Sequence, residues 1–197
     1  MKNAKPDFKT VIITPVFRLS YPNVWEPRMN QLAKREEYSI QMLFDKATAK
    51  TSMAEMVKTV NFLIKWKGWE GVPTVRRPFI DGDTKKDSAG VLWCEKNPAF
   101  KGMIIVRSWS KQAPGIVDPT GKNPILQHDE IYGGCYCRAQ LNAYAYEQAG
   151  NKGVSFGLLH IQKIRDGESF GNRGKAEDAF SPVENAGETL SEEAIFG

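Results

Sequence analysis

The chain has 197 residues, with 27 Lys and Arg against 23 Asp and Glu, a formal net charge of +4. This length fits one domain with appendages, and a hydrophobic content of 41% supplies a packed core, which excludes a wholly disordered chain. No apolar run approaches the roughly 18 residues of a membrane-spanning helix, and residues 1–7 lack the apolar stretch of a signal peptide. We therefore expect a protein that acts in the cytoplasm where it is made.

Charge is divided unequally along the chain. Residues 176–197 hold six acidic residues and no Lys or Arg, so residues 1–175 hold the other 17 acidic and all 27 basic residues, a net charge of +10. A basic body attracts a polyanion, and a tethered acidic tail can compete with that polyanion for the same surface. We predict a nucleic-acid-binding domain over residues 1–175 and a disordered acidic tail over residues 176–197.

The first predicted elements are two strands and the principal helix. Residues 11–17 form a β-rich run that Pro22 and Pro27 are expected to end. Residues 38–44 alternate apolar and polar side chains, which predicts a half-buried strand. A helix is predicted from an N-cap at Ser52 to a stop at Gly68. Its apolar face is Met53, Met56, Val57, Val60, Leu63 and Ile64, and Trp66 and Trp69 are expected to pack it on the core.

A long irregular segment separates this helix from the next predicted strand. Residues 68–90 show no regular periodicity, residues 101–110 alternate like a strand, and residues 112–124 are a loop rich in Pro and Gly. Basic side chains of this region are candidates for phosphate contact, although Asp residues dilute them. The candidates are Arg76, Arg77, Lys85, Lys86 and Lys101.

Residues 131–146 are the most informative predicted strand. The odd positions are small or apolar, which predicts a core face, and the even positions carry tyrosines, amides and an arginine. Aromatic side chains stack on bases without reading their sequence. With Arg107 and Trp109 added from residues 101–110, the predicted DNA-stacking surface is Tyr132, Tyr136, Arg138, Tyr144 and Tyr146.

Residues 154–164 complete a set of about five strands with one inserted helix. A small, strongly curved sheet of this size favours a mainly β protein with an OB-type barrel, which binds single strands on one face. An open α+β sheet is the alternative fold.

Metal and catalytic sites are disfavoured. Cys135 and Cys137 share one strand face, and Cys94, His128 and His160 are the other conceivable zinc ligands, but the spacing lacks the usual second ligand pair. Buried cysteines are the simpler interpretation, and no cofactor is predicted. The run His128-Asp129-Glu130 leaves a metal-dependent nuclease as a minor alternative, because no established catalytic motif is present.

The tail ends in apolar residues after its acids. This pattern is typical of a short peptide that docks into a basic, hydrophobic pocket of a partner. The predicted docking residues are Glu188, Glu192, Glu193 and Phe196.

Several segments resemble a family of bacteriophage single-stranded DNA-binding proteins with an OB fold. The most specific is residues 131–146, Ile-Tyr-Gly-Gly-Cys-Tyr followed by Cys-Arg-Ala-Gln-Leu-Asn-Ala-Tyr-Ala-Tyr, and residues 78–83, 114–118, 152–158 and 164–168 follow the same family pattern. Residues 1–70 match only in outline, and Ala179 stands where the family often has an acid. The tail resembles acidic, aromatic-ended tails of phage and bacterial single-strand binders, which bind replication partners and compete with DNA.

We therefore predict a non-enzymatic, sequence-tolerant single-stranded DNA-binding protein of phage replication or recombination. Its expected partners are single-stranded DNA and, through the tail, replication or recombination proteins. An RNA-binding OB module is the principal alternative, and a homodimer is left open.

Overall fold

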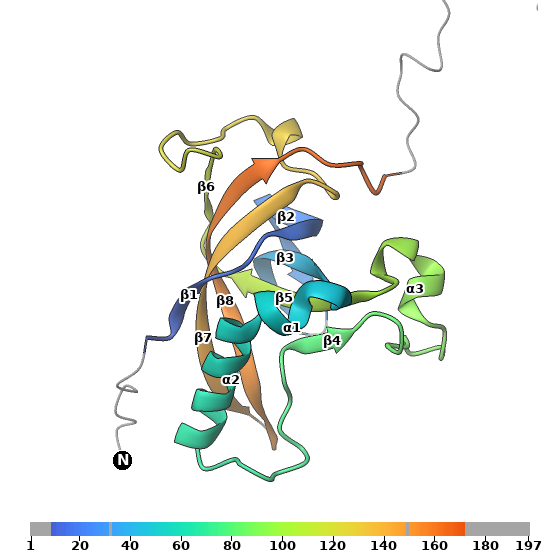
Figure 1. Ribbon diagram of the computed structural model, residues 1–197, viewed down its shortest axis with the longest axis vertical. Coiled ribbons are helices and arrows are strands. Elements are labelled where there is room, and N and C mark those ends of the chain that lie inside the picture. Colours follow the sequence, from blue (N-terminus) through green and yellow to red (C-terminus); the bar gives the residue numbers. More distant parts are fainter. Residues whose placement is uncertain (1–8, 32, 149, 172–197) are drawn as a thin grey trace, which may run out of the picture.

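The computed structural model describes residues 9–31, 33–148 and 150–171 (Figure 1). These residues form eight strands of one sheet: β1 Val11–Ile13, β2 Phe17–Asn30, β3 Arg35–Asp45, β4 Phe79–Asp81, β5 Met103–Ser110, β6 Gly115–Val117, β7 Tyr136–Gln148 and β8 Asn151–Arg165. The helical elements are α1 Lys46–Ser52, α2 Ala54–Trp66, α3 Trp93–Lys96 and two 3₁₀ turns, η1 Pro98–Phe100 and η2 His128–Glu130. The predicted mainly β class is confirmed. The acidic tail lies outside the described residues.

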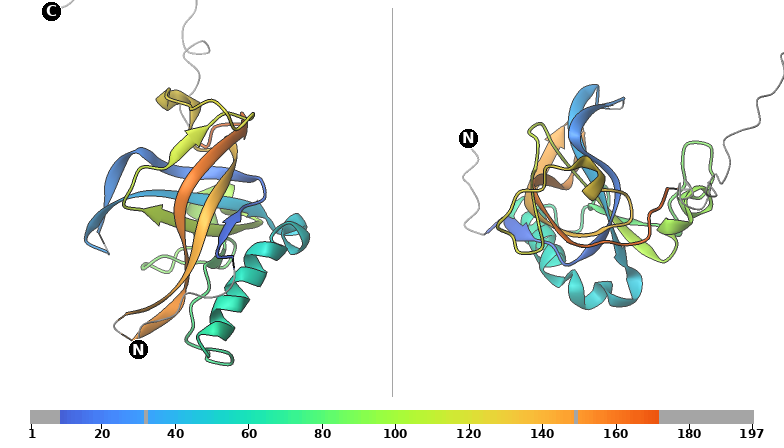
Figure 2. Two further views of the ribbon diagram at one scale, coloured as in Figure 1. Left: turned by 90° about the vertical axis from the view of Figure 1, so that its left-hand side faces the viewer. Right: turned by 90° about the horizontal axis from the view of Figure 1, so that it is seen from above.

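The five long strands pair in a circuit. β7 pairs with β2, β2 with β3, β3 with β5, β5 with β8, and β8 again with β7. Of these pairings only β5 with β8 is parallel. The three-residue strands β1, β4 and β6 attach to β7, β5 and β8, and the two views of Figure 2 show the strongly twisted strands crossing one another above α1 and α2. Two of these short strands, β4 and β6, lie in segments that the sequence predicted to be irregular.

The strand predicted over residues 11–17 is divided, since β1 ends at Ile13 and β2 begins only at Phe17, and β2 does not end at the prolines as predicted. It continues through Pro22 and Pro27 because its pairing with β3 is irregular at both places, with register shifts between Ser20 and Asn23 and between Asn23 and Arg28. A bulged residue has no ladder partner, so the missing N–H of proline costs no hydrogen bond there. The prediction of a turn at these prolines was wrong for this reason.

The principal helix begins earlier than predicted and is split into two. The carboxylate of Asp45 caps α1 by accepting from the Ala47 amide, whereas Ser52 is the last residue of α1 and its hydroxyl donates to the Thr48 carbonyl. Met53 then joins α1 to α2, so the predicted N-cap was wrong. The predicted apolar face is buried except for Val57, and Gly68 adopts a φ of +66° after α2, as the predicted stop requires. Trp69 is buried, while Trp66 is exposed.

The main core lies inside the circuit of long strands. On β7 the predicted alternation is confirmed, since Cys135, Cys137, Ala139, Leu141 and Ala143 are all buried and the side chains between them are at least partly exposed. β7 begins at Tyr136, later than predicted, after Gly134. A Cβ on Gly134 would lie 2.0 Å from the carbonyl oxygen of Glu168, so the chain after β8 crosses this glycine closely.

A second, smaller cluster lies on the opposite side of the sheet. Leu43 of β3 and Ile105 of β5 are buried there beneath Phe100 of η1, with Trp93 packed alongside. The segment that carries α3 and η1 therefore covers part of the outer surface of β3 and β5. None of the helices in the described part of the chain has the length and apolar character to cross a membrane.

Candidate nucleic-acid interface

Two predicted contact residues, Arg107 and Trp109, lie on the outer surface of β5. They border a pocket of about 340 Å³, and Arg107 also borders an adjoining pocket of about 210 Å³. Tyr21 of β2 and Gln41 of β3 line both pockets, and Trp93 of α3 lines the second. We call these five residues the β5 face.

Tyr21 reaches this face because of the bulge in β2. Its φ is +45°, a conformation that a bulky side chain seldom adopts, and its side chain is 55% exposed. Its ring lies 6.3 Å from the ring of Phe100, which belongs to the second cluster. The surrounding structure thus holds a strained backbone that presents an aromatic ring to solvent.

Each tryptophan of the β5 face contacts an arginine. The Cζ atom of Arg35 lies 3.5 Å from the ring centroid of Trp109, and Arg35 also pairs with Glu37 at 2.9 Å. The Cζ atom of Arg107 lies 4.7 Å from the centroid of Trp93. Desolvation lowers the pKa of Arg107, although an arginine side chain stays charged. The β5 face therefore combines aromatic rings with permanent positive charge.

One polar atom of this face has no hydrogen-bond partner. The side-chain Oε1 of Gln41 is buried, and no described residue donates to it. Leaving a buried acceptor unsatisfied costs free energy, about 1–3 kcal/mol. Gln41 lines both pockets, so a rotation of its side chain would bring this oxygen within reach of an N–H group of a ligand there. Every nucleobase has ring or exocyclic N–H groups on its pairing edge.

The predicted tyrosine platform on β7 is arranged differently. The Cζ atom of Arg165 lies 3.4 Å from the centroid of Tyr136, and that of Arg18 lies 5.5 Å away. A Cβ on Gly167 would lie 2.9 Å from the Tyr136 ring, so the chain after β8 also crosses it. The ring of Tyr136 is thus already covered by the protein itself.

The other predicted tyrosines are held in two places, with Tyr132 near Tyr136 and the remaining two farther along β7. The hydroxyl of Tyr132 donates to the Gly167 carbonyl at 2.9 Å and contacts Asp166 at 3.1 Å, which fixes the chain after β8. Tyr144 and Tyr146 lie near the β7–β8 turn, with Tyr144 eight residues or about 26 Å along the strand from Tyr136. Arg138 donates to the Gln162 side chain at 2.8 Å. We call the outward side chains of β7 from Tyr136 to Tyr146 the β7 face.

The residues weighed as possible zinc ligands and nuclease residues do not assemble into one site. The thiols of Cys135 and Cys137 are buried with their Sγ atoms 3.6 Å apart, while Cys94 lies near Asp83 and His160 near Gly115. Burial and the neighbouring thiol raise the pKa of Cys137. In η2, the His128 ring stacks on Trp25 at 4.5 Å and Glu130 pairs with Lys163 at 3.5 Å. Within the described residues, no group of three or more His, Cys, Asp or Glu side chains has the arrangement of a metal site.

Comparison with known proteins identifies the family. The family described as Enterobacter phage Enc34, ssDNA-binding protein, matches residues 10–190. The chain belongs to this family. The resemblance that the sequence suggested, to phage single-stranded DNA-binding proteins, is therefore confirmed. A relative among curated proteins, protein p50 of Acyrthosiphon pisum secondary endosymbiont phage 1, is 26% identical over 170 residues, which are 81% of this chain and 85% of that protein.

Solved structures of phage proteins have the same fold. The single-stranded DNA-binding protein of bacteriophage Enc34 has a TM-score of 0.66 at 22% identity, over 87% of this chain and 90% of that one. The same Enc34 protein in complex with ssDNA has a TM-score of 0.68 at 21% identity, over 82% and 90%. The bacteriophage T7 protein gp2.5, a single-stranded DNA-binding protein, has a TM-score of 0.52 at 14% identity, over 92% and 98%.

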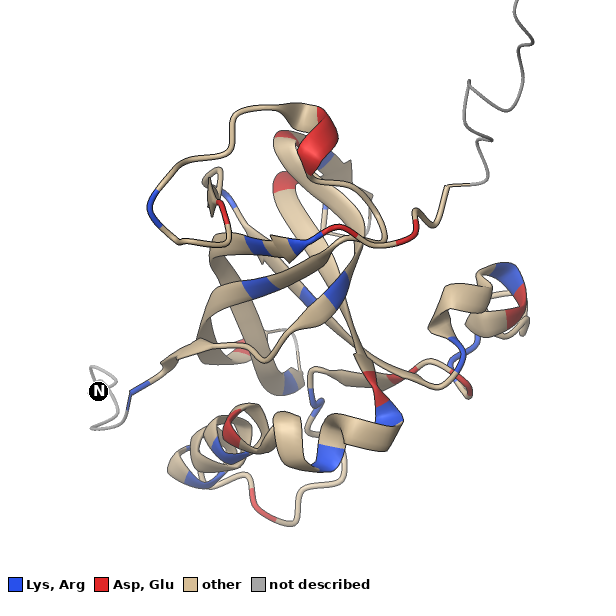
Figure 3. Cartoon of the chain, turned by 45° about the horizontal axis from the view of Figure 1, so that its top comes forward, with Lys and Arg blue, Asp and Glu red and all other residues tan. Residues whose placement is uncertain are grey.

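In this family member the predicted loop cations are dispersed. Arg76 is held by the β7–β8 turn, where its amide donates to the Lys152 carbonyl at 2.9 Å, and Arg77 donates to Asn61 of α2 at 2.8 Å. The Nζ atom of Lys85 lies 5.7 Å from the ring centroid of Trp93 in α3. Lys86 forms an isolated antiparallel β-bridge with Leu92, the N-cap residue of α3, so both lysines lie beside this helix. Lys101 follows η1 directly. Figure 3 shows the same spread, with basic residues on the strands, on α1 and on α2.

Sequence reasoning missed three residues of the β5 face. Tyr21 was placed in a turn because Pro22 follows it, and Trp93 lies in a segment without periodicity. Gln41 was recognised only as a polar position of a strand. A signal for Tyr21 was present, since an aromatic residue before proline in a β-rich run also fits a bulge.

Proposed function

We propose that the chain binds single-stranded DNA in a sequence-tolerant manner and that the β5 face is its principal contact surface. The observation that carries the proposal is the joint position of Arg107 and Trp109 beside Tyr21 and Trp93, around two pockets that Gln41 also lines. Aromatic rings stack on exposed bases, and a guanidinium neutralises phosphate. A duplex hides its base faces, which is why a single strand is the expected ligand.

The position of this face in the strand circuit supports the proposal. We infer that the five long strands form an OB-type barrel, in which β3 and β5 are the second and third strands in chain order. OB folds bind oligonucleotides on the surface of their second and third strands. Arg107 and Trp109 of β5 and Gln41 of β3 lie on these two strands. The solved complex of the Enc34 protein with ssDNA has the same fold and agrees with this ligand.

In this proposal the remaining predicted contact residues bind the parts of the DNA strand that extend beyond the β5 face; we call them the outer path. Lys85 and Lys86 beside α3, with Lys101 after η1, extend the β5 face and hold phosphates as it is filled. Arg76, Arg77, Arg138, Tyr144 and Tyr146 contact DNA only when the strand is long enough to continue around the body. Tyr132 and Tyr136 have a supporting role, because the chain after β8 already contacts them.

The acidic tail acts in this proposal as a competitor and a docking peptide. Residues 176–197 carry six acids, and a tethered segment reaches effective concentrations of about mM, so even weak binding to the basic body lowers the affinity for short strands. Once DNA fills the face, the released tail with Glu188, Glu192, Glu193 and Phe196 is free to bind replication or recombination proteins of the phage in the host cytoplasm.

A salt-titrated binding assay tests the ligand. Full-length protein is measured by fluorescence anisotropy against labelled single-stranded DNA, duplex DNA and RNA of the same sequence. We expect single-stranded DNA to bind most tightly and its affinity to fall steeply with salt. Equal affinity for the duplex would exclude base stacking as the main interaction, and preference for RNA would favour an RNA-binding module.

A truncation tests the competitor role of the tail. A chain that ends at Lys175 is compared with the full chain on a short oligonucleotide, and tighter binding is expected after truncation. A matched chain of full length in which the six tail acids become amides separates charge from length. Unchanged affinity in both chains would show that the tail does not mask the DNA-binding surface.

A further inference from the structure

A large apolar groove lies between the helices and the sheet, away from the pockets of the β5 face. It has a volume of about 850 Å³ and is lined by α1, α2, β4 and the start of β5. Met53, Val57, Phe79 and Ile104 contribute apolar surface to it, and the Val57 side chain is 37% exposed. Sites for small ligands and peptide side chains have volumes of about 300–1,000 Å³. The groove is thus large enough for two or three apolar side chains.

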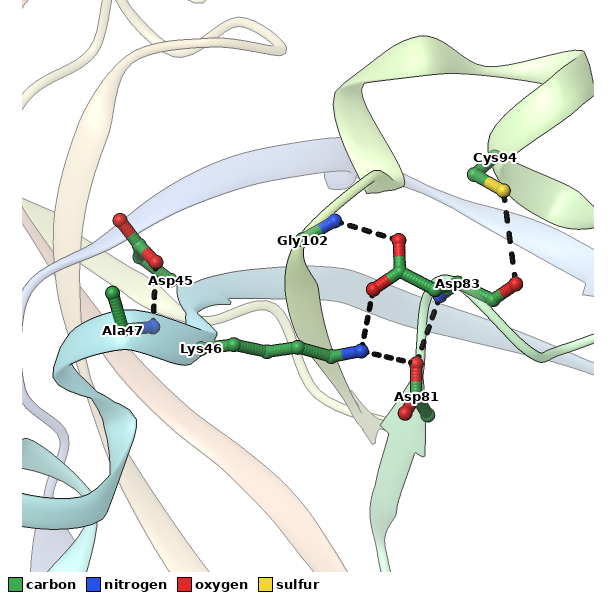
Figure 4. Close-up of polar contacts among 7 residues, drawn as sticks. All are labelled: Asp45, Lys46, Ala47, Asp81, Asp83, Cys94 and Gly102. Carbon is green, nitrogen blue, oxygen red and sulfur yellow. Dashed lines mark hydrogen bonds and ion pairs between the residues drawn. The ribbon is translucent and has the colours of Figure 1, made fainter.

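A polar network fixes one end of the groove. The Nζ atom of Lys46, the first residue of α1, lies 2.5 Å from carboxylate oxygens of both Asp81 and Asp83 (Figure 4). Asp83 also accepts from the Gly102 amide at 2.8 Å, which ties the chain after β4 to the start of β5. These contacts join α1 to β4 and hold the two walls of the groove in position. They also compensate the charge of Lys46.

Two further lysines on the groove are uncompensated. Lys50 of α1 and Lys58 of α2 line it, are exposed, and form no ion pair with any residue in the described ranges. Since the apolar floor lies between cationic side chains, the ligand that fits has apolar side chains next to negative charge. An acidic peptide with a hydrophobic end has this chemistry.

The chain itself contains such a peptide. Its last residues, Glu192-Glu193-Ala194-Ile195-Phe196-Gly197, place two acids one residue before two large apolar residues. They follow the last described residue, Gly171, by at most 26 residues, and an extended segment of that length reaches roughly 85 Å. Tethering gives this segment an effective concentration of about mM, above that of a second copy at ordinary protein concentrations.

We propose that this groove receives the end of the chain's own tail, with Ile195 and Phe196 on its apolar floor and the two preceding glutamates beside Lys50 and Lys58. The inference rests on the proposed DNA-binding function and deepens its regulation. A tail anchored here is attached to the body at both ends, so its remaining acids are held close to the basic surface without occupying the pockets of the β5 face. Masking then depends on a site that DNA itself does not contact.

Photo-crosslinking in the full-length chain tests the proposal. The photoreactive analogue p-benzoylphenylalanine is incorporated in place of Phe196, and crosslinked peptides are identified by mass spectrometry. We expect crosslinks to α1, α2 or β4 of the same chain. Mixing ¹⁵N-labelled with unlabelled protein distinguishes crosslinks within one chain from those between two copies.

Matched variants make the result specific. Val57→Asp in the groove should abolish the crosslink, whereas Val72→Asp, at a valine of similar exposure (39%) outside the groove, should leave it intact. The double variant Lys50→Glu/Lys58→Glu should lower the yield, and Lys65→Glu on α2 should not. Circular dichroism verifies that each variant is folded; because Val57 is partly exposed, its substitution should not prevent folding.

The outcomes separate this inference from the proposed function. Crosslinks that map to the β5 face, join two copies, or persist in Val57→Asp would overturn the groove as the tail site, while DNA binding and masking could both stand. If Val57→Asp abolishes the crosslink but leaves the affinity for single-stranded DNA unchanged, the groove is the tail site and the masking role is refuted instead.

Discussion

The β5 face and the β7 face both combine aromatic rings with arginines and both border a pocket, but only the pockets of the β5 face are lined by Trp and Tyr rings, whereas the pocket of about 330 Å³ beside Arg138 and Gln140 is not. On the β7 face, Arg165 covers Tyr136 and Arg138 bonds to Gln162, so these contacts are made within the protein. On the β5 face, the side chains surround pockets, and the Gln41 oxygen has no partner among the described residues. The number of aromatic residues on a strand therefore does not measure its capacity to bind bases. That capacity depends instead on which rings and polar atoms the folded chain leaves available to a ligand.

The largest expected effect concerns the support beneath the β5 face. Phe100 is buried in the second cluster and contacts both Tyr21 and Trp93, so Phe100→Ala should lower the free energy of unfolding by about 3 kcal/mol and also weaken DNA binding. Ile116→Ala is the control, because it opens the main core at β6 instead. Chemical denaturation and anisotropy measure the two effects. Normal DNA binding by folded Phe100→Ala would count against the β5 face.

The next effect compares aromatic rings on the two faces. Trp109→Ala should weaken the binding of a short single strand by about tenfold, since a stacked base contributes roughly 1–3 kcal/mol. Tyr136→Ala and Tyr144→Ala should change it much less, because Tyr136 is covered and Tyr144 lies along the outer path. The same anisotropy assay, with an oligonucleotide just long enough to bind one protein molecule, shows which variant loses the most affinity. The reverse ranking would restore the β7 face as the stacking platform.

A smaller effect compares the two arginines. Arg107→Ala should weaken binding a few-fold and lower the slope of log affinity against log salt by about 1, as expected for one lost phosphate contact. Arg138→Ala should leave the slope on a short strand unchanged, because its guanidinium is bonded to Gln162. Arg107→Lys, which keeps the charge, should retain the slope. Identical slopes for Arg107→Ala and wild type would remove Arg107 from the interface.

The smallest effect is a pH dependence at Asp166, in the chain after β8 that crosses Tyr136. Lys163 and the Tyr132 hydroxyl lower the pKa of Asp166, so this acid stabilises the folded chain above its ordinary pKa of about 4, and the contribution is lost as the pH falls through the lowered value. Asp166→Asn should thus be destabilising at pH 7 and progressively less so towards pH 3. Denaturation curves at three pH values, with Asp129→Asn in η2 as the control, measure the difference. A loss of stability in Asp166→Asn that is the same at every pH would contradict the stabilising role of the ion pair between Asp166 and Lys163.

Much of the fold was predictable, because four of the five long strands, β3, β5, β7 and β8, were recognised in the sequence. The alternation on β7 and the apolar face of α2 follow directly from burial on one side, and both were confirmed. The path of β2 was not predictable from Pro22 and Pro27, since local turn chemistry cannot reveal that the partner strand tolerates bulges at both places. The three-residue strands β4 and β6 are too short to show a period and exist because a long strand lies next to them.

The candidate site was predicted only in part for a similar reason. Arg107 and Trp109 were found because both alternate on one strand, but Trp93 and Tyr21 join them through the packing of Phe100. Sequence also gave no sign that the chain after β8 returns across Tyr136. Local periodicity carries no information on contacts between segments far apart in the chain. The family resemblance draws on many positions at once, and it was confirmed.

The strand pairings determine which sheet edges a neighbouring copy of the chain could pair with. Within the described residues, the pairings of β2 with β7 and of β5 with β8 each cover only two residue pairs. The strands at the two ends of the pairing path, β1 and β6, have three residues each, as has β4. Exposed strand edges are templates for aggregation, and very short ones offer few backbone groups to a neighbour. The longest free edge in the described part of the chain is that of β2 beyond Leu19. It carries Pro22, Pro27 and two register shifts, and both prolines and bulges hinder pairing with the sheet of another copy.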